Sequence, residues 1–202
     1  MGITGASGVI YGVRLLQVLQ QTNVETHLVL SKWGARTLLH ETPHTQQEVV
    51  EMATYHYAPQ NKGAAISSGS FVTQGMVVCP CSVRTLAAIA QGNGDTLVHR
   101  AADVVLKERR KLVLVVRETP LNDIHLENML KLSRMGVVIF PPVPAFYNRP
   151  RKIEDIVDQT VMRVLDQFGI HLPSQRRWDG DMSPVEKSSD AVEVPQKRKR
   201  QG

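Results

Sequence analysis

The residues with the clearest chemical potential open the chain. Gly2, Gly5 and Gly8 recur at every third position, and Ser7 lies between the last two. A turn of small residues that leads into a helix brings backbone N–H groups close to an anion, and the helix dipole adds roughly half a positive charge there. The pattern therefore predicts a phosphate cradle with Ser7 as a hydroxyl donor. The alternative is a tight turn that binds nothing, because the spacing matches neither a Walker A loop nor G-x-G-x-x-G.

Further candidate ligands follow the apolar segments that have the pattern of strands. They are Ser31 and Lys32; Ser82, Val83, Arg84 and Thr85; Arg117 and Glu118; and Tyr147 and Arg149. A phosphorylated ligand needs several donors that converge on one anion. Each group alone is unremarkable, because Ser and Thr are also ordinary helix N-caps. Arg117 with Glu118 is harder to explain as a surface pair, since the two could hold a leaving phosphate and move a proton.

A second charged segment, residues 100–110, mixes apolar and ionic residues in the pattern of one helix. Its simplest interpretation is structural. Arg100 would pair with Asp103, and Lys107 with Asp103, as neighbours three and four residues apart on a helix. The pattern alone leaves open whether Arg100 or Lys107 serves a ligand.

The apolar pattern predicts elements that could position these residues. Helices are predicted at 9–22, 32–41, 45–57, 83–91, 96–109, before Gly136, and at 153–168; strands are predicted at 25–31, 75–80, 111–116 and 137–140. Only three residues precede Thr4, so we expect the first strand to be very short or clipped. Apolar strands that alternate with helices predict an α/β fold with an open, mainly parallel, Rossmann-like or flavodoxin-like sheet, covered on both faces to give three layers. Ligands bind such sheets at the carboxyl ends of the strands, near the topological switch point.

Composition narrows the class of protein further. The 202 residues, 42% hydrophobic with no apolar run of membrane-spanning length, predict one domain over 1–180. Cys79 and Cys81 have no zinc-type spacing of partners, so we interpret them as reduced and buried rather than catalytic, in a cytoplasmic protein. The net charge of +5 is spread along the chain and aromatic content is 5%, which favours anionic small molecules over nucleic acid. Residues 181–202 are predicted to be a disordered basic tail; its Lys197–Arg200 run could be a targeting or nucleic-acid patch, although a solvated tail is favoured.

Eight short sequence segments resemble those of a known protein family. They are Gly5-Ala6-Ser7-Gly8, Ser31-Lys32, Ser67-Ser68-Gly69-Ser70, Pro80-Cys81-Ser82-x-x-Thr85, residues 100–103 with 106–109, Arg117-Glu118, residues 125–130, and Pro144-Ala145-Phe146-Tyr147. Because they occur in one order over about residues 2–180, the chain resembles the UbiX-type flavin prenyltransferases. Within that family it is most similar to the subunits that accompany phenolic (hydroxyarylic) acid decarboxylases.

The resemblance implies a function that composition and spacing do not. It implies a metal-independent enzyme that transfers a dimethylallyl group from dimethylallyl monophosphate to N5 and C6 of reduced FMN. The product, prenylated FMN, would serve a UbiD-type decarboxylase of aromatic acids. The resemblance also implies a homododecamer with active sites at subunit interfaces. Two alternatives stay open at this point: a non-catalytic FMN-binding partner subunit of a decarboxylase complex, and a flavin-dependent decarboxylase.

The resemblance also implies roles for individual residues. The expected FMN ligands are Gly5, Ala6, Ser7, Ser31, Ser82, Val83, Arg84, Thr85 and Arg117. The residues expected around the prenyl phosphate are Tyr147, Arg163, Lys107, Arg117, Glu118 and Arg100. Glu41 matches a carboxylate that handles protons, so the expected catalytic set is Glu41, Lys107, Arg117 and Glu118. A mere flavin carrier has no use for the second phosphate site, which distinguishes the transferase from that alternative.

Overall fold

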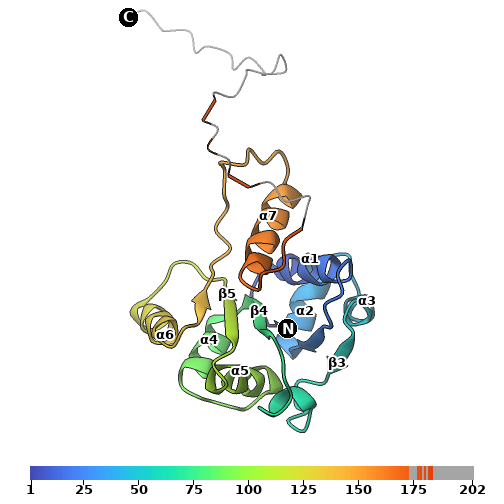
Figure 1. The fold of residues 1–202 in the computed structure, drawn as a ribbon, viewed down its shortest axis with the longest axis vertical. Coiled ribbons are helices and arrows are strands. Elements are labelled where there is room, and N and C mark those ends of the chain that lie inside the picture. Colours follow the sequence, from blue (N-terminus) through green and yellow to red (C-terminus); the bar gives the residue numbers. More distant parts are fainter. Residues whose placement is uncertain (173–176, 179, 181, 184–202) are drawn as a thin grey trace, which may run out of the picture.

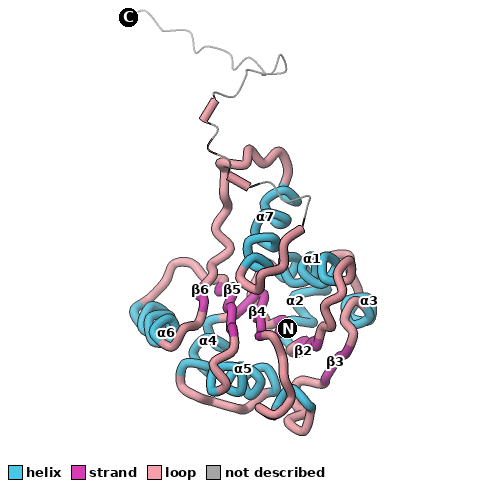
Figure 2. Tube along the Cα trace, in the orientation of Figure 1, coloured by secondary structure: helices cyan, strands magenta, loops and turns pink. Residues whose placement is uncertain are grey.

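Six parallel strands form one sheet in the order β3-β2-β1-β4-β5-β6, seen in the computed structural model, which describes residues 1–172, 177–178, 180 and 182–183 (Figures 1 and 2). The strands are β1 Gly2–Ile3, β2 His27–Leu30, β3 Tyr55–Tyr57, β4 Gly75–Cys81, β5 Lys111–Val116 and β6 Val138–Ile139. The chain runs outward from β1 through β2 to β3 and then crosses to β4 on the other side of β1. The topological switch point therefore lies between β1 and β4.

Helices cover both faces of the sheet, as predicted. On one face are α1 Val9–Leu19, α2 Lys32–Glu41, α3 Gln46–Glu51 and α7 Ile153–Asp166. On the other face are α4 Val83–Ala90, α5 Leu97–Lys107 and α6 Asp123–Arg134, together with a short 3₁₀ helix, Ala65–Ser67. Figure 1 shows α1 beside α7, and α4 between α5 and α6. The predicted three-layer α/β architecture is confirmed.

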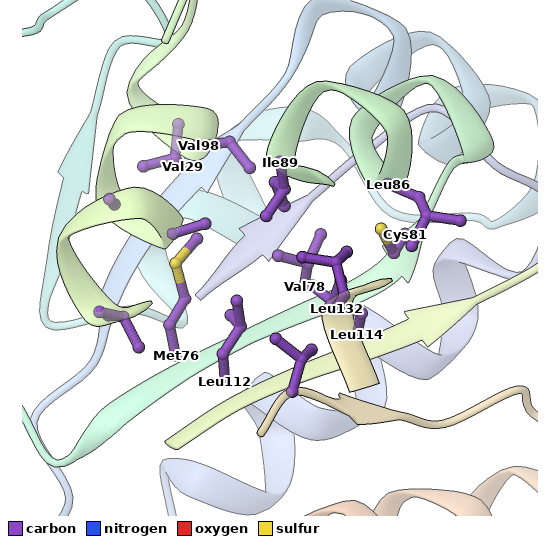
Figure 3. Packing of buried hydrophobic residues seen from close by; sticks show 14 of the residues in the cluster. Val29, Met76, Val78, Cys81, Leu86, Ile89, Val98, Leu112, Leu114 and Leu132 are labelled. Carbon is purple, nitrogen blue, oxygen red and sulfur yellow. The ribbon is translucent and has the colours of Figure 1, made fainter. Parts of the chain in front are cut away.

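The central strands are apolar because side chains from both of their faces are buried. Val78 and Leu114 face one cluster, where they pack with Leu86 of α4 and Leu132 of α6 (Figure 3). Val113 faces the opposite cluster, beneath α1 and α7. Full burial of a Leu or Val side chain contributes about 1.5–3 kcal/mol. This packing fixes the carboxyl ends of β1, β4 and β5 relative to one another.

One predicted helix is wrong in its second half. The predicted capping box is present, since Thr45 Oγ1 accepts from Glu48 N at 3.2 Å and Glu48 Oε2 accepts from Thr45 N at 2.7 Å. The helix ends at Glu51, however, and Tyr55–Tyr57 forms strand β3 at the sheet edge. Two aromatic residues around a histidine favour a strand over a helix, and β3 gains backbone hydrogen bonds from β2.

Other boundaries differ by a few residues. Helix α1 ends at Leu19 rather than at residue 22, and α7 ends at Asp166 rather than at 168. Strand β4 continues past Pro80 to Cys81, one residue beyond the predicted end at Pro80. The ladder between β4 and β5 shifts register between Val78 and Cys81, and this irregularity accommodates a residue without an N–H group. The predicted tail, apart from residues 182 and 183, lies outside the described residues.

Candidate functional site

A cavity of about 370 Å³ lies at the carboxyl edge of the sheet. Ser7 and Gly8 line it from the turn after β1, Glu41 from the end of α2, Arg117 from the end of β5, and Tyr11 from α1. Ile10, Pro142, Ile153 and Val157 complete the lining. Its volume falls in the range of small-molecule sites. Two of the strand ends that the sequence singled out, those of β1 and β5, therefore meet at one cavity beside the switch point.

The turn after β1 needs its glycines for two different reasons. Gly8 has φ +89° as the residue that precedes α1, and this left-handed conformation is strained for residues with a Cβ. A Cβ on Gly5 would lie 2.4 Å from Cβ of Trp33, so the turn packs against the start of α2. The tight turn is therefore confirmed, and it places Ser7 at the mouth of the cavity.

The anion at the N-terminus of α1 is the carboxylate of Glu41. Its Oε2 accepts from Gly8 N at 2.8 Å and from Val9 N at 3.1 Å. A negative charge is stabilised at this point because the first helical N–H groups lack partners within the helix and the dipole is positive there. The phosphate cradle expected at this turn stays a prediction. The sequence did not predict that a side chain of the same chain would hold two of the turn's N–H groups.

The predicted hydroxyl ligands also act as helix caps. Ser31 Oγ accepts from Gly34 N at 2.9 Å at the start of α2. Ser82 Oγ accepts from Thr85 N at 3.3 Å and donates to Thr85 Oγ1 at 3.1 Å at the start of α4. The ordinary capping role that the sequence left open is thus present at both places. A hydroxyl can cap a helix and still accept or donate a further bond to a ligand.

Sequence reasoning missed Thr4, which connects the two turns of the site. Thr4 is buried, and its Oγ1 donates to the carbonyl oxygen of Pro80 at 2.8 Å. Thr4 Oγ1 also accepts a hydrogen bond from Ser82 N at 2.9 Å. The turn after β1 is thereby fixed to the start of α4. A usable signal was present, because a hydroxyl residue that ends a central strand beside a glycine turn has backbone partners within reach on the next strand.

Tyr11 is a second cavity residue that the sequence did not single out. It lies three residues after Gly8, on the cavity face of α1. Burial raises the pKa of its phenol, the proximity of Cys79 raises it further, and the positive charge of Arg117 opposes the shift. Tyr11 therefore stays a neutral hydroxyl at physiological pH. Its spacing of one helical turn from the glycine was the available signal.

Tyr147 and Arg163 are brought together by α7. Gln159 of this helix donates from Nε2 to Tyr147 Oη at 3.0 Å, and Arg163 lies one turn further on the same face. The guanidinium of Arg163 pairs with Asp166 through Nη1 at 2.7 Å. Val157, which lines the cavity, lies six residues before Arg163, or roughly 9 Å along the helix axis. Tyr147 thus contacts α7 one turn before Arg163, and this helix also lines the cavity through Val157.

Arg100 and Lys107 lie elsewhere in the chain. Lys107 ends α5, four residues before β5 begins at Lys111, whereas Arg117 follows the opposite end of β5. Six residues of extended strand separate these ends by roughly 20 Å. A single chain therefore does not bring Lys107 to the cavity at the carboxyl edge.

The ion pairs on α5 were predicted only in part. Arg100 pairs with Asp103 at 2.7 Å, as predicted, and its Nε donates to the carbonyl of Ser67 at 3.2 Å. Lys107 pairs with the adjacent Glu108 rather than with Asp103, so that prediction is wrong. The Lys107 ammonium lowers the pKa of the Glu108 carboxyl through this hydrogen bond.

Other features of the described part of the chain carry less chemistry. Glu118 accepts from Thr119 N at 3.1 Å beside Arg117. A larger cavity of about 410 Å³, lined mainly by apolar residues, lies at the amino edge of the sheet and contains none of the predicted ligands. Among the described residues no three His, Cys, Asp or Glu side chains gather in a way that could hold a metal ion. None of the helices in that part of the chain is long and apolar enough to span a membrane.

A doubly wound parallel sheet with a glycine-containing turn at its switch point is typical of α/β nucleotide-binding proteins. Comparison with known proteins makes the class specific. A family model described as flavoprotein matches residues 1–165. The probable UbiX-like flavin prenyltransferase of Bacillus subtilis is 61% identical over 180 residues, which cover 89% of this chain and 88% of that protein.

Two solved structures are similar over most of the fold. The dodecameric FMN-dependent UbiX-like decarboxylase from Escherichia coli O157:H7 gives a TM-score of 0.87 at 59% identity, covering 89% of this chain and 97% of that one. AnUbiX in complex with FMN and dimethylallyl pyrophosphate gives 0.88 at 51% identity, covering 89% and 95%. The chain belongs to the flavoprotein family and, within it, to the UbiX-like flavin prenyltransferases.

Proposed function

We propose that the protein joins a dimethylallyl group from dimethylallyl monophosphate to N5 and C6 of reduced FMN and releases prenylated FMN. The observation that carries the proposal is the meeting of Ser7, Glu41 and Arg117 at one cavity beside the switch point. High identity to named flavin prenyltransferases, together with a relative solved with FMN and dimethylallyl pyrophosphate, supports the same activity.

The residues at the carboxyl edge fit FMN. The turn formed by Gly5, Ala6 and Ser7 offers backbone N–H groups and a hydroxyl, and the start of α4, from Ser82 to Thr85, faces it across the hydrogen bonds of Thr4. The Ser31 hydroxyl and the Arg117 guanidinium add donors at neighbouring strand ends. When bound, reduced FMN supplies the ring atoms that accept the dimethylallyl group. Val83 and Arg84 would contact it from the first turn of α4.

Cations of the chain would stabilise the departing phosphate. Cleavage of the C–O bond of dimethylallyl monophosphate leaves negative charge on phosphate, and Arg163, Lys107 and Arg117 can bind this charge. Donors aimed at charge that develops in the transition state contribute roughly 3–4 kcal/mol each in water-excluded sites. Tyr147 would add a hydroxyl bond to the same group. We assign no metal to the reaction, because these cations supply the charge that a metal would supply.

A carboxylate of the chain would move the proton. Glu41, held by Gly8 N and Val9 N, is fixed at the cavity wall, and Glu118 lies beside Arg117. We assign to Glu41 the removal of the proton from C6 that completes the transfer, with Glu118 as the second carboxylate near the phosphate. Both are within the expected catalytic set.

The complete site would require more than one subunit. Lys107 lies near the opposite edge from Arg117, and Arg100 lies on the same helix outside the lining of the cavity, so in an oligomer they would enter the site of a neighbouring copy. Exposed apolar side chains such as Ile124 and Leu130 on α6 offer surface for such contacts. The E. coli relative is dodecameric, and we propose the same assembly for this chain.

The product would be consumed by a UbiD-type decarboxylase of aromatic acids, in the cytoplasm. The experiment that tests the proposal reconstitutes this transfer. The protein, reduced FMN and dimethylallyl monophosphate are incubated without oxygen, and the filtrate is added to a cofactor-free UbiD-type decarboxylase. The proposal predicts carbon dioxide release only when all three components were present. Release from an aromatic acid and this protein alone would instead support the flavin-dependent decarboxylase, and no activation at all would leave the FMN-carrier alternative.

A further inference from the structure

The carboxylate of Asp166, at the end of α7, is surrounded by basic side chains. The side chain of Asp166 is 7% exposed, yet it contacts three basic residues. Arg163 donates to Oδ2 at 2.7 Å, Arg177 donates to Oδ1 at 2.6 Å, and His171 Nδ1 lies 2.8 Å from Oδ1. A second Arg177 bond reaches Oδ2 at 3.3 Å, so this contact is bidentate. A buried carboxylate with such partners holds them in one geometry, because each bond is charge-assisted.

Tyr147 is contacted both by α7 and by the residue next to Arg177. Gln159, one turn before Arg163 on α7, donates to Tyr147 Oη at 3.0 Å. Trp178, the residue after Arg177, packs edge-on against the Tyr147 ring with centroids 5.8 Å apart at 85°. Arg177 and Trp178 therefore connect the end of the helix to the proline-rich loop. Two of the residues proposed to bind the prenyl phosphate, Arg163 and Tyr147, are thus contacted by one group of side chains.

We infer that Asp166 is a positioning residue for the prenyl-phosphate site, which orients Arg163 directly and secures Tyr147 through Arg177 and Trp178. The inference rests on the proposed function, because it takes Arg163 and Tyr147 as phosphate ligands. Asp166 itself does not contact the substrate, since its two oxygens are occupied by basic side chains.

The charge balance of the cluster supports a positioning role. Two guanidinium groups share one carboxylate, so the cluster keeps a net positive charge that suits a phosphate. The Asp166 bond uses Nη1 of Arg163, whereas a guanidinium has five N–H donors in a fixed plane. When Asp166 fixes one edge of the guanidinium plane, the N–H groups on the opposite edge are oriented toward the phosphate. A purely electrostatic role for Asp166 predicts the reverse outcome, because its negative charge would then weaken phosphate binding.

The test measures binding of dimethylallyl monophosphate by titration calorimetry, with oxidised FMN present so that no turnover occurs. Asp166→Asn preserves shape and removes the charge. We expect roughly tenfold weaker binding, the scale of one misaligned charge-assisted bond. FMN affinity should be unchanged. In an Arg163→Ala background, Asp166→Asn should add only the smaller loss that comes through Arg177, Trp178 and Tyr147, because the residue that Asp166 orients directly is then missing. Asp166→Glu, which restores the charge, should recover part of the affinity.

Asp158→Asn is the matched control. Asp158 lies on the same helix and pairs with Arg14 at 2.5 Å, but Arg14 has no proposed ligand role. Its substitution should leave prenyl-phosphate affinity unchanged.

Unchanged or tighter binding by Asp166→Asn, while Arg163→Ala weakens binding, would overturn the inference and leave the proposed function intact. Additive losses in the double variant would also overturn it. A wild-type protein that binds no dimethylallyl monophosphate would contradict the proposed function, and the inference would fall with it. If Asp166→Asn does not fold, Arg177→Gln replaces it, with roughly threefold weaker binding expected; no change in that variant would refute the positioning role.

Discussion

Gly12→Ala tests how closely α1 must approach the sheet to present the turn at the site. A Cβ on Gly12 would lie 2.3 Å from the carbonyl oxygen of Cys79 in β4 and 3.2 Å from Cδ1 of Ile3. The first contact is about 1 Å too short for carbon and oxygen, and a carbonyl in a central strand cannot rotate away. Overpacking of this kind costs about 3 kcal/mol. Alanine regains about 1 kcal/mol of helix propensity over glycine. The net expectation is destabilisation by about 2 kcal/mol.

The assay is urea and thermal unfolding of the wild type and variant, with FMN titration in parallel. For a domain of this size, 2 kcal/mol corresponds to a fall in Tm of roughly 4–8 °C. Because α1 must move outward and carries the Ser7–Gly8 turn with it, FMN affinity should fall as well. Gly94→Ala is the control, since a Cβ there meets nothing within 4 Å. A Gly12→Ala protein as stable as the wild type would refute the proposed close packing of α1 on β4.

Three further predictions concern single features. Thr4→Val removes the acceptor of Ser82 N and should destabilise the fold by about 2 kcal/mol in urea while weakening FMN binding; unchanged FMN affinity would contradict its role in holding the two turns together. Burial raises the pKa of the Cys79 and Cys81 thiols, so above about pH 8.5 they stay protonated in the folded state while the unfolded thiols ionise. The free energy of unfolding should therefore decline as pH rises through this value, and the native thiols should resist dithionitrobenzoate; rapid native-state labelling would count against burial. Leu130→Asp on the exposed face of α6, where Leu130 is 51% exposed, should give smaller oligomers by light scattering with an unchanged circular dichroism spectrum. An intact large assembly would exclude this face as an interface.

Much of the fold followed from the sequence because its strands are apolar on both faces. Segments such as Leu112 to Val116 cannot alternate in polarity when helices cover both sides of the sheet, and that pattern is visible without a structure. Strand β3 was missed because it is a short edge strand. Its pairing begins at a non-local contact, in which Thr26 and Thr54 each donate a backbone N–H to the other's hydroxyl at 3.0 Å. The local sequence pattern does not indicate a contact between residues this far apart in the chain.

The site was predictable only where it is local in sequence. The turn from Gly5 to Gly8 could be predicted from the spacing of its glycines. Glu41, however, reaches this turn from 33 residues away, and spacing alone does not show that contact. Arg163 on an exposed helix face looked like a solvated residue, and only family resemblance singled it out. Neither residue spacing nor family resemblance singled out Asp166, because its proposed role depends on the basic side chains that the fold places around it.

The mass of the flavin after one turnover tests the central claim most directly. The protein is mixed without oxygen with equal amounts of reduced FMN and dimethylallyl monophosphate, and the flavin is released and weighed by mass spectrometry. We expect a flavin heavier by one C5H8 unit, with inorganic phosphate released in equal amount, and a strongly reduced yield with Glu41→Gln at unchanged FMN affinity. Recovery of FMN at its original mass from folded, FMN-binding wild-type protein would contradict the central claim.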